Sequence, residues 1–198
     1  GIKARVAMAQ QEYDIAATHA IAARQGPPLM TNAEYTAGFN SCAVGEWIWG
    51  SNQIVDHNTF FWSFFANMGC NFNGTNTRTQ PKAINSALYN ALSTTDVRSK
   101  VFSRTGAGVP IPPGGLRIPF QSQKFLAAGP ALSTGDVPMM RSAEMLLIEA
   151  EARAMAGQFT LAQDALFTLM RNRDPNYVKS TQTGPALLAE IDLHRRVE

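Results

Sequence analysis

The sequence lacks the features that would assign it to several classes of protein. Its 198 residues contain no uninterrupted apolar run of about 18 residues, so we expect no membrane-spanning helix. The formal net charge is only +2 and no basic run occurs, which argues against a nucleic-acid partner. With 45% hydrophobic and 16% charged residues, the composition is typical of a globular protein with a sizeable core.

Cysteine and histidine are also scarce. Cys42 and Cys70 are far apart and could form one disulfide, but two cysteines make no disulfide framework. There is no CxxC or HExxH motif, and the three histidines are isolated from one another, so we expect neither a metal site nor a cofactor. The first residues, GIKARVAMAQ, lack the apolar segment and cleavage site of a signal peptide. Both ends resemble helix interiors, and we therefore expect a fragment of a longer protein.

Three zones of different composition follow one another along the chain. Residues 1–26 are alanine-rich and helical in pattern, and residues 139–198 are helical again. Residues 27–138 between them are rich in Asn, Thr, Ser, Gly, Pro and aromatic residues, with only short periodic segments. We expect one structural unit overall, in which a helical scaffold is interrupted by a large loop-rich region that faces a ligand.

The two helical zones repeat each other. Residues 2–21 align without a gap on residues 148–167, so that Ile2 matches Ile148, Tyr13 matches Phe159 and Ala16 matches Ala162. Each copy has small residues on a first helix, a short polar break, and an aromatic residue that opens a second helix. This pattern is typical of a tetratricopeptide-type hairpin, which must stack on other elements to bury its apolar face. The predicted fold class is therefore mostly α, with such hairpins as scaffold.

Shorter patterns lie between the two copies. The alternation in EWIWGS (46–51) predicts a strand in which Trp47 and Trp49 pack against the helices. Apolar residues at helical spacing in AINSALYNAL (83–92) predict a short helix. The segment DVPMMRSAEM (136–145) predicts extended chain that leads into a long helix.

The segment DVPMMRSAEMLLIEAEARAMAG resembles the signature helix of the SusD/RagB family. The family pattern is a hydrophobic residue, Arg, any residue, Ala and Glu, and later Ala-Glu-Ala, here at Met140–Glu144 and Ala150–Ala152. Other segments are similar to further parts of the family: KARVAMAQQEYDIAATHA, LSTTDVRSKVF (92–102), ALFTLMRNR (165–173) and LLAEIDLHRRVE (187–198).

The resemblance implies a nutrient-binding lipoprotein on the outer-membrane surface of Bacteroidetes, with a SusD-like α-α superhelix. Such a protein binds a glycan or other nutrient and hands it to a SusC-like TonB-dependent transporter, without catalysis. Membrane contact is expected only through an N-terminal lipid anchor. The signal and lipobox region and the extreme C-terminal motif of the family are expected to be missing from this chain.

The candidate ligand site lies in the loop-rich zone. Five aromatic residues occur between Phe60 and Phe65, and an asparagine-rich stretch follows at 71–80. Aromatic rings stack on the C–H faces of sugars, and amides on loops bind hydroxyl groups. Most of these rings are nevertheless expected to be core, because five exposed rings would be too much apolar surface, and Trp62 is the best candidate. The predicted ligand-binding residues are Trp62, Phe64, Asn71, Asn73, Asn76 and Arg78.

The charged residues of the long helices have a structural interpretation. Glu144 and Glu151 lie two turns apart, about 10 Å along the helix, which is near or beyond the spacing of a glycosidase pair. We expect them to form ion pairs with arginines of a neighbouring helix, such as Arg195 or Arg196. Arg171 and Arg173 are expected only to end their helix, where basic residues are favourable.

Two other functions stay open on the sequence. A tetratricopeptide-type adaptor would place the aromatic residues and asparagines on a helical face, where they would bind a peptide. A glycoside hydrolase would need two carboxylates in one cleft, and acidic residues are absent between Asp56 and Asp96. That absence counts against an enzyme.

Overall fold

The computed structural model describes residues 1–57 and 61–198. The chain forms two compact units, each built from separate stretches. The first, here called the helical unit, comprises Gly1–Met30, Gly45–Trp49 and Met140–Glu198, and the second, the loop-rich unit, comprises Thr31–Val44 and Gly50–Met139.

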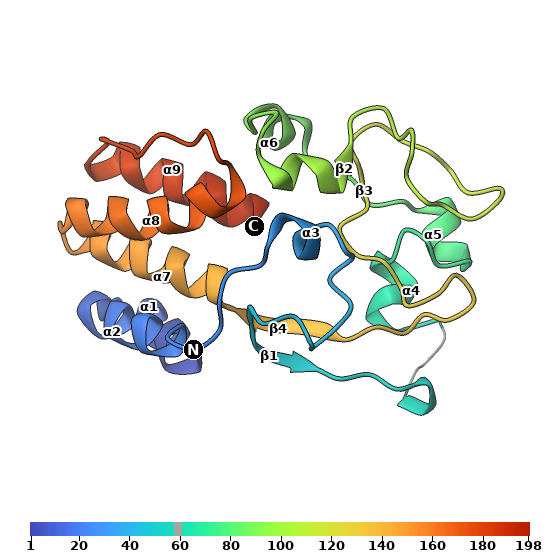
Figure 1. Ribbon diagram of the computed structural model, residues 1–198, viewed down its shortest axis with the longest axis horizontal. Helices are drawn as coiled ribbons and strands as arrows, with labels where there is room; N and C mark the ends of the chain where they lie inside the picture. The colour runs from blue at the N-terminus through green and yellow to red at the C-terminus, as the bar shows by residue number, and fades with distance from the viewer. Residues whose placement is uncertain (58–60) are drawn as a thin grey trace. The chain divides into compact units, whose positions relative to one another are not determined.

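The helical unit is a stack of helices. It contains α1 (Ile2–Ala9), α2 (Tyr13–Ala23), α7 (Ser142–Met155), α8 (Phe159–Arg173) and α9 (Gly184–Val197). Helix α7 lies between α2 and α8, and α9 packs against α7 and α8 (Figure 1). The predicted mostly helical fold with tetratricopeptide-like hairpins is confirmed.

The sequence repeat is also a structural repeat. The turns of the α1–α2 and α7–α8 hairpins each pass through one left-handed residue, Gln11 with φ of 62° and Gly157 with φ of 74°. In the first turn the N–H of Glu12 donates to the carbonyl oxygen of Ala7 at 2.9 Å. In the second turn the N–H of Gln158 donates to the carbonyl oxygen of Arg153 at 2.8 Å. The two hairpins therefore share one turn geometry.

Two apolar clusters hold this stack together. The first joins α1 and α2 to α7 and consists mainly of alanines, whose small side chains let the helices approach closely: Ala4, Ala7, Ala16, Ala17, Ala20, Met140, Met145, Ile148 and Ala152. The second joins α7, α8 and α9 and is richer in leucine: Ala143, Leu146, Leu147, Ala150, Ala154, Ala162, Ala165, Leu166, Leu169, Met170, Leu187 and Ile191.

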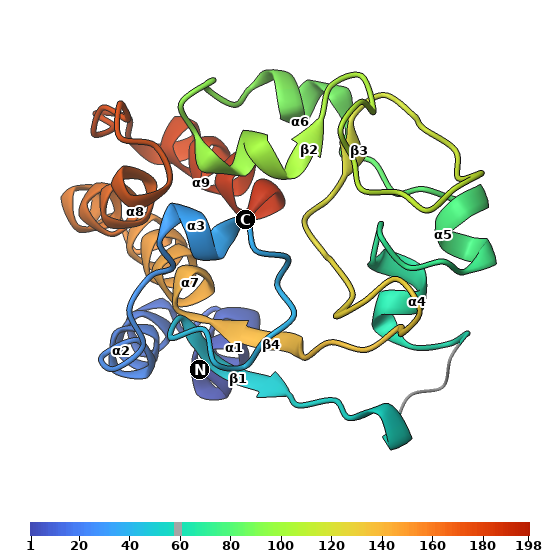
Figure 2. The same ribbon diagram turned by 45° about the vertical axis from the view of Figure 1, so that its right-hand side comes forward.

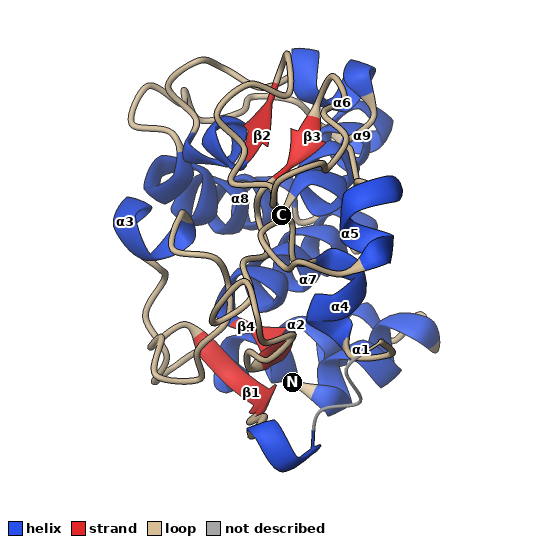
Figure 3. Cartoon of the chain, turned by 90° about the vertical axis from the view of Figure 1, so that its right-hand side faces the viewer, coloured by secondary structure: helices blue, strands red, loops and turns tan. Residues whose placement is uncertain are grey.

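The loop-rich unit has only short regular elements, joined by long loops (Figures 2 and 3). Strand β2 (Phe102–Ser103) pairs antiparallel with β3 (Gln121–Ser122). Its helices are α3 (Asn32–Tyr35), η1 (Val55–His57), α4 (Phe64–Met68), α5 (Thr75–Thr79), α6 (Ser86–Asn90) and η2 (Val97–Val101). The helix predicted within 83–92 is α6, which begins after Asn85 because that side chain accepts a hydrogen bond from the N–H of Ala87.

The predicted strand and the predicted extended lead-in are both confirmed. Strand β1 (Trp47–Ser51) pairs with β4 (Val137–Arg141), and α7 follows β4 directly. Trp47 is buried as expected, but Trp49 is 50% exposed, so the expectation that it packs is wrong. Trp47 and Trp49 lie two residues apart and therefore on the same face of β1, so their difference in burial does not come from the alternation of the strand but from tertiary packing.

Side-chain amides and carboxylates connect the loops of the loop-rich unit. Asp136 accepts hydrogen bonds from the backbone N–H groups of Cys42 at 2.7 Å and Gln53 at 2.9 Å, and from the amide of Asn52 at 3.0 Å. Burial acts to raise the pKa of Asp136, but these hydrogen bonds outweigh it, and its pKa lies below the ordinary value. Cys42 and Cys70 are both free thiols, the first exposed and the second buried.

Candidate ligand-binding surface

The aromatic segment divides at Ser63 into exposed and buried parts. Trp62 is 84% exposed and Phe61 is 61% exposed, whereas Phe65 is buried. Ser63 is the N-cap of α4, since its hydroxyl oxygen accepts a hydrogen bond from the N–H of Ala66 at 3.1 Å. Residues before the cap lie on a turn and those after it enter the helix. Phe60, which was counted in this cluster, lies outside the described residues.

Phe64 and Phe65 belong to the interior of the loop-rich unit. Phe64 packs edge-on against Phe65, with ring centroids 5.2 Å apart, and against Phe125 at 4.9 Å. Ala66, Phe72 and Ala127 are also buried in this cluster. Phe64, a predicted ligand-binding residue, is therefore half-buried in an aromatic core. Phe61, which was not among the predicted ligand-binding residues, is exposed. The N-capping Ser63 is the sequence feature that could have distinguished the exposed pair, Phe61 and Trp62, from the packed pair, Phe64 and Phe65.

The predicted asparagines differ in their surroundings. The amide of Asn71 donates to the carbonyl oxygen of Ala127 at 2.9 Å and accepts from its N–H at 2.7 Å, so that both amide atoms are engaged. The amide of Asn76 donates to the side-chain oxygen of Asn67 at 3.0 Å. The side chain of Asn73 is exposed, and its backbone N–H donates to the carbonyl oxygen of Pro130 at 2.8 Å.

Arg78 lies near the end of α5 and is half-buried. Its Nε atom is buried without a hydrogen-bond partner among the described residues. Because this nitrogen is not accessible, a contact with a ligand would have to come from the terminal nitrogens of the Arg78 side chain.

The segment that carries Trp62 and Asn73 offers exposed aromatic and amide side chains. No acidic residue occurs between Asp56 and Asp96, so the segment that carries Trp62 and Asn73 supplies no carboxylate pair. Burial raises the pKa of the Cys70 thiol to about 12, which keeps it protonated and a poor nucleophile. No group of three or more His, Cys, Asp and Glu side chains could hold a metal ion within residues 1–57 and 61–198.

The carboxylates of α7 form ion pairs with two different helices. Glu151 pairs with Arg195 of α9, whereas Glu144 pairs with Arg5 of α1 at 2.6 Å. Both carboxylates thus meet an arginine of a neighbouring helix, but the partner of Glu144 is Arg5 of α1 and neither Arg195 nor Arg196. Arg196 is exposed, with no ion pair in the described part of the chain.

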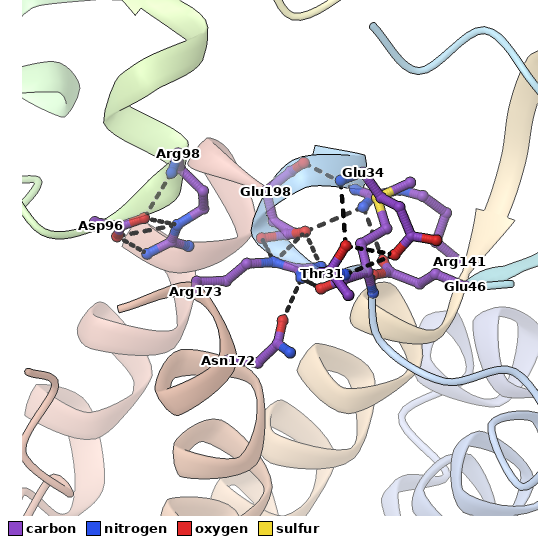
Figure 4. A network of polar contacts seen from close by, with 10 residues as sticks. Thr31, Glu34, Glu46, Asp96, Arg98, Arg141, Asn172, Arg173 and Glu198 are labelled. Atoms are coloured by element: carbon purple, nitrogen blue, oxygen red, sulfur yellow. Dashed lines mark hydrogen bonds and ion pairs between the residues drawn. The ribbon is translucent and has the colours of Figure 1, made fainter. Parts of the chain in front are cut away.

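Arg173 does more than end α8. Its side chain is fully buried and contacts the carboxylates of Glu46 at 2.8 Å and Glu198 at 2.9 Å (Figure 4). Arg141 contacts the same two carboxylates at 2.9 Å and 3.1 Å. Glu46 also accepts the backbone N–H of Met30 at 2.6 Å. The sequence did not reveal this network, since its members lie far apart and resemble ordinary surface charges.

Comparisons with known proteins are consistent with this architecture. A sequence model described as the SusD family matches residues 60–198. No curated protein matches the chain. None of the helices that the structure describes is both long and apolar enough to cross a membrane.

Solved structures share the fold along nearly the whole chain. A SusD-like carbohydrate binding protein from Bacteroides vulgatus has 24% identity and a TM-score of 0.81, covering 100% of this chain and 41% of that protein. A SusD superfamily protein from Bacteroides thetaiotaomicron has 19% identity and a TM-score of 0.74, covering 98% and 45%. Surface glycan-binding protein A from Bacteroides uniformis has 14% identity and a TM-score of 0.65, covering 99% and 45%. The chain thus spans less than half the length of these structures.

Proposed function

This chain belongs to the SusD family, and from that premise we propose that it binds a glycan at the cell surface. The observation that carries the proposal is the exposure of Trp62, which is 84% exposed beside Phe61 on a turn of the loop-rich unit. Two of the structures that share the fold are described as carbohydrate-binding or glycan-binding proteins.

The binding mechanism is stacking supported by a few polar contacts. The rings of Trp62 and Phe61 receive the apolar C–H face of a sugar, and the exposed amide of Asn73 and the terminal nitrogens of the half-buried Arg78 bind hydroxyl groups. Aromatic rings have few rotatable bonds, so they lose little conformational entropy when they bind. The loops that carry these residues are held in place by Asn71, Asn76 and Phe64. No bond is made or broken.

The proposal extends to the longer protein of which this chain is expected to be a part. That protein acts at the outer-membrane surface, is attached by an N-terminal lipid anchor and hands its ligand to a SusC-like TonB-dependent transporter. Family membership supports this extension. The ion pairs of Glu144 with Arg5 and of Glu151 with Arg195 support a non-catalytic role, because each carboxylate already has a cationic partner.

The alternative is a tetratricopeptide-type adaptor that binds a peptide. The positions of the candidate residues disfavour it, because Trp62 and Asn73 belong to the loop-rich unit and neither lies on a helical hairpin. We therefore assign the ligand-facing role to the loop-rich zone, residues 27–138.

Calorimetry with a panel of oligosaccharides tests the proposal. Trp62→Ala is expected to weaken binding at least about tenfold, which corresponds to about 1.4 kcal/mol. Trp49→Ala is the matched control, because Trp49 is also an exposed tryptophan but belongs to the helical unit, and it should leave the affinity unchanged. A folded wild-type chain that binds no glycan would overturn the proposal, as would equal losses in both variants.

A further inference from the structure

The loop-rich unit carries an excess of positive charge. It contains seven lysines and arginines but four aspartates and glutamates, whereas the helical unit contains ten and eleven. Three of the four acidic side chains are engaged within the unit. Asp96 forms a buried ion pair, Asp136 accepts backbone N–H groups, and Glu34 belongs to the capping box of α3. The charge that this unit presents to a partner is therefore positive, which favours a partner of negative charge.

A narrow cleft in this unit contains polar side chains but no carboxylate. Residues at the C-terminal end of α4, in α5 and in β3 line it, together with Gln80 and Lys82. Its volume of about 10 Å³ is roughly the room for one water-sized group, so a single oxygen atom can enter but a sugar ring cannot. None of its lining residues in the described chain is acidic. Burial raises the pKa of the Cys70 thiol in its wall to about 12, so a negative group in the cleft would meet no like charge.

Backbone pairing places Lys82 beside Ser122. Ala83 pairs antiparallel with Gln121, and the N–H of Ser122 donates to the carbonyl oxygen of Lys82 at 2.7 Å. Directly opposed residues of an antiparallel pair point to the same face. The side chains of Lys82 and Ser122 therefore lie next to each other along the cleft.

These side chains keep hydrogen-bond donors for a ligand. Lys82 and Gln80 are exposed, and their side chains form neither a hydrogen bond nor an ion pair with a residue that the structure describes. The hydroxyl oxygen of Ser122 accepts the N–H of Lys124 at 3.3 Å, and its own O–H has no acceptor within the described ranges. An ammonium, an amide and a hydroxyl around one cleft suit a group that has negative charge and several lone pairs.

We propose that this cleft binds the anionic substituent of an acidic glycan, either the carboxylate of a uronic acid or a sulfate ester. Lys82 supplies the positive charge, and Ser122 and Gln80 donate hydrogen bonds to the oxygen atoms. One oxygen enters the cleft while the sugar ring stays outside. Trp62 precedes α4 and the cleft lies at the other end of that short helix. The inference rests on the proposed glycan binding and names the class of glycan.

Calorimetry with matched pairs of oligosaccharides tests the inference. Uronic-acid oligosaccharides are measured beside their methyl esters, sulfated oligosaccharides beside their desulfated forms, and neutral oligosaccharides complete the panel. For at least one pair the acidic form should bind at least about tenfold more tightly than its neutral counterpart, and added salt should reduce the difference. The pair that shows the preference identifies the substituent as carboxylate or sulfate.

Two variants separate the cleft from the overall charge of the unit. Lys82→Gln should bring the affinities for the acidic and neutral forms together, because it removes the cation of the cleft. Lys100→Gln is the matched control, since it lowers the charge of the same unit equally but lies outside the cleft, where Lys100 donates to the carbonyl oxygen of Thr94 at 2.9 Å. It should keep the preference.

Three outcomes would count against the inference in different ways. Glycan binding without preference for any acidic form would overturn it and leave the proposed glycan binding intact. Equal losses of preference in Lys82→Gln and Lys100→Gln would overturn the assignment to the cleft. A folded chain that binds no member of the panel would overturn both this inference and the proposed function.

Discussion

The helical unit and the loop-rich unit use their polar side chains differently. In the helical unit, charged side chains join separate helices in ion pairs, as Glu144 of α7 does with Arg5 of α1 and Glu151 of α7 does with Arg195 of α9. In the loop-rich unit, short polar side chains bind backbone groups, as Asn71 does with Ala127 and Asp136 with Cys42 and Gln53.

The difference follows from backbone hydrogen bonding. A helix pairs its own N–H and C=O groups, so its side chains are available for packing and for contacts with other helices. Loops leave these groups unpaired, and buried ones must find partners in side chains or water. Many asparagines in a loop-rich zone therefore indicate loop structure first and a ligand site second.

The largest effect is expected in the helical unit. Arg173→Met leaves Glu46 and Glu198 with one cationic partner fewer in a buried site, and we expect a loss of about 3–5 kcal/mol in the free energy of unfolding. Urea denaturation measures it. Arg171→Met is the matched control in the same turn, because Arg171 is exposed, and it should change stability by less than about 0.5 kcal/mol. Similar results for both variants would show that the network contributes little.

The next effect compares two asparagines of the loop-rich unit. Asn71→Ala removes both hydrogen bonds to the buried backbone of Ala127 and should lower the free energy of unfolding by about 1–3 kcal/mol. Asn73→Ala should leave stability nearly unchanged and weaken glycan binding, because the Asn73 side chain is exposed. Thermal unfolding and calorimetry together measure both properties. A loss of stability in Asn73→Ala and a loss of binding alone in Asn71→Ala would show that the two residues have the opposite roles.

Asp136 should make the loop-rich unit sensitive to acid. Its pKa is lowered in the folded state, so its stabilising effect is fully present above the ordinary aspartate pKa and is lost as pH falls through the lowered folded value. Asp136→Ala should cost about 1–2 kcal/mol at neutral pH and flatten the acid limb of the stability profile. Denaturation at a series of pH values tests this. An unchanged acid limb in the variant would assign the sensitivity to another group.

The smallest effect concerns the repeated turn. Gly157→Ala should cost about 1 kcal/mol, because φ is 74° there and an added Cβ meets no atom within 4 Å, so backbone strain alone acts. Gln11→Gly at the equivalent position should relieve the same strain and be neutral or slightly stabilising. The thermal unfolding midpoints of the two variants, compared with that of the wild type, measure both effects. Destabilisation by Gln11→Gly would mean that its side chain has a role beyond the turn.

The sequence alone determined the elements that depend on local patterns. The repeated hairpins, the strand within 46–51 and the extended lead-in to α7 follow from the spacing of apolar residues over short windows. That spacing predicts secondary structure without tertiary contacts. The resemblance to SusD/RagB proteins rested on such segments as well, and family membership is shown over residues 60–198.

Only the tertiary structure decided how individual side chains are used. The burial of Arg173, the pairing of Glu144 with Arg5 and the exposure of Trp49 depend on residues far away in the sequence. Asn71 and Asn73 have the same chemistry and lie two residues apart, yet one is bonded through its side chain to Ala127 and the other is exposed. The physical reason is that burial and hydrogen bonding belong to the surroundings of a residue, which local sequence does not contain.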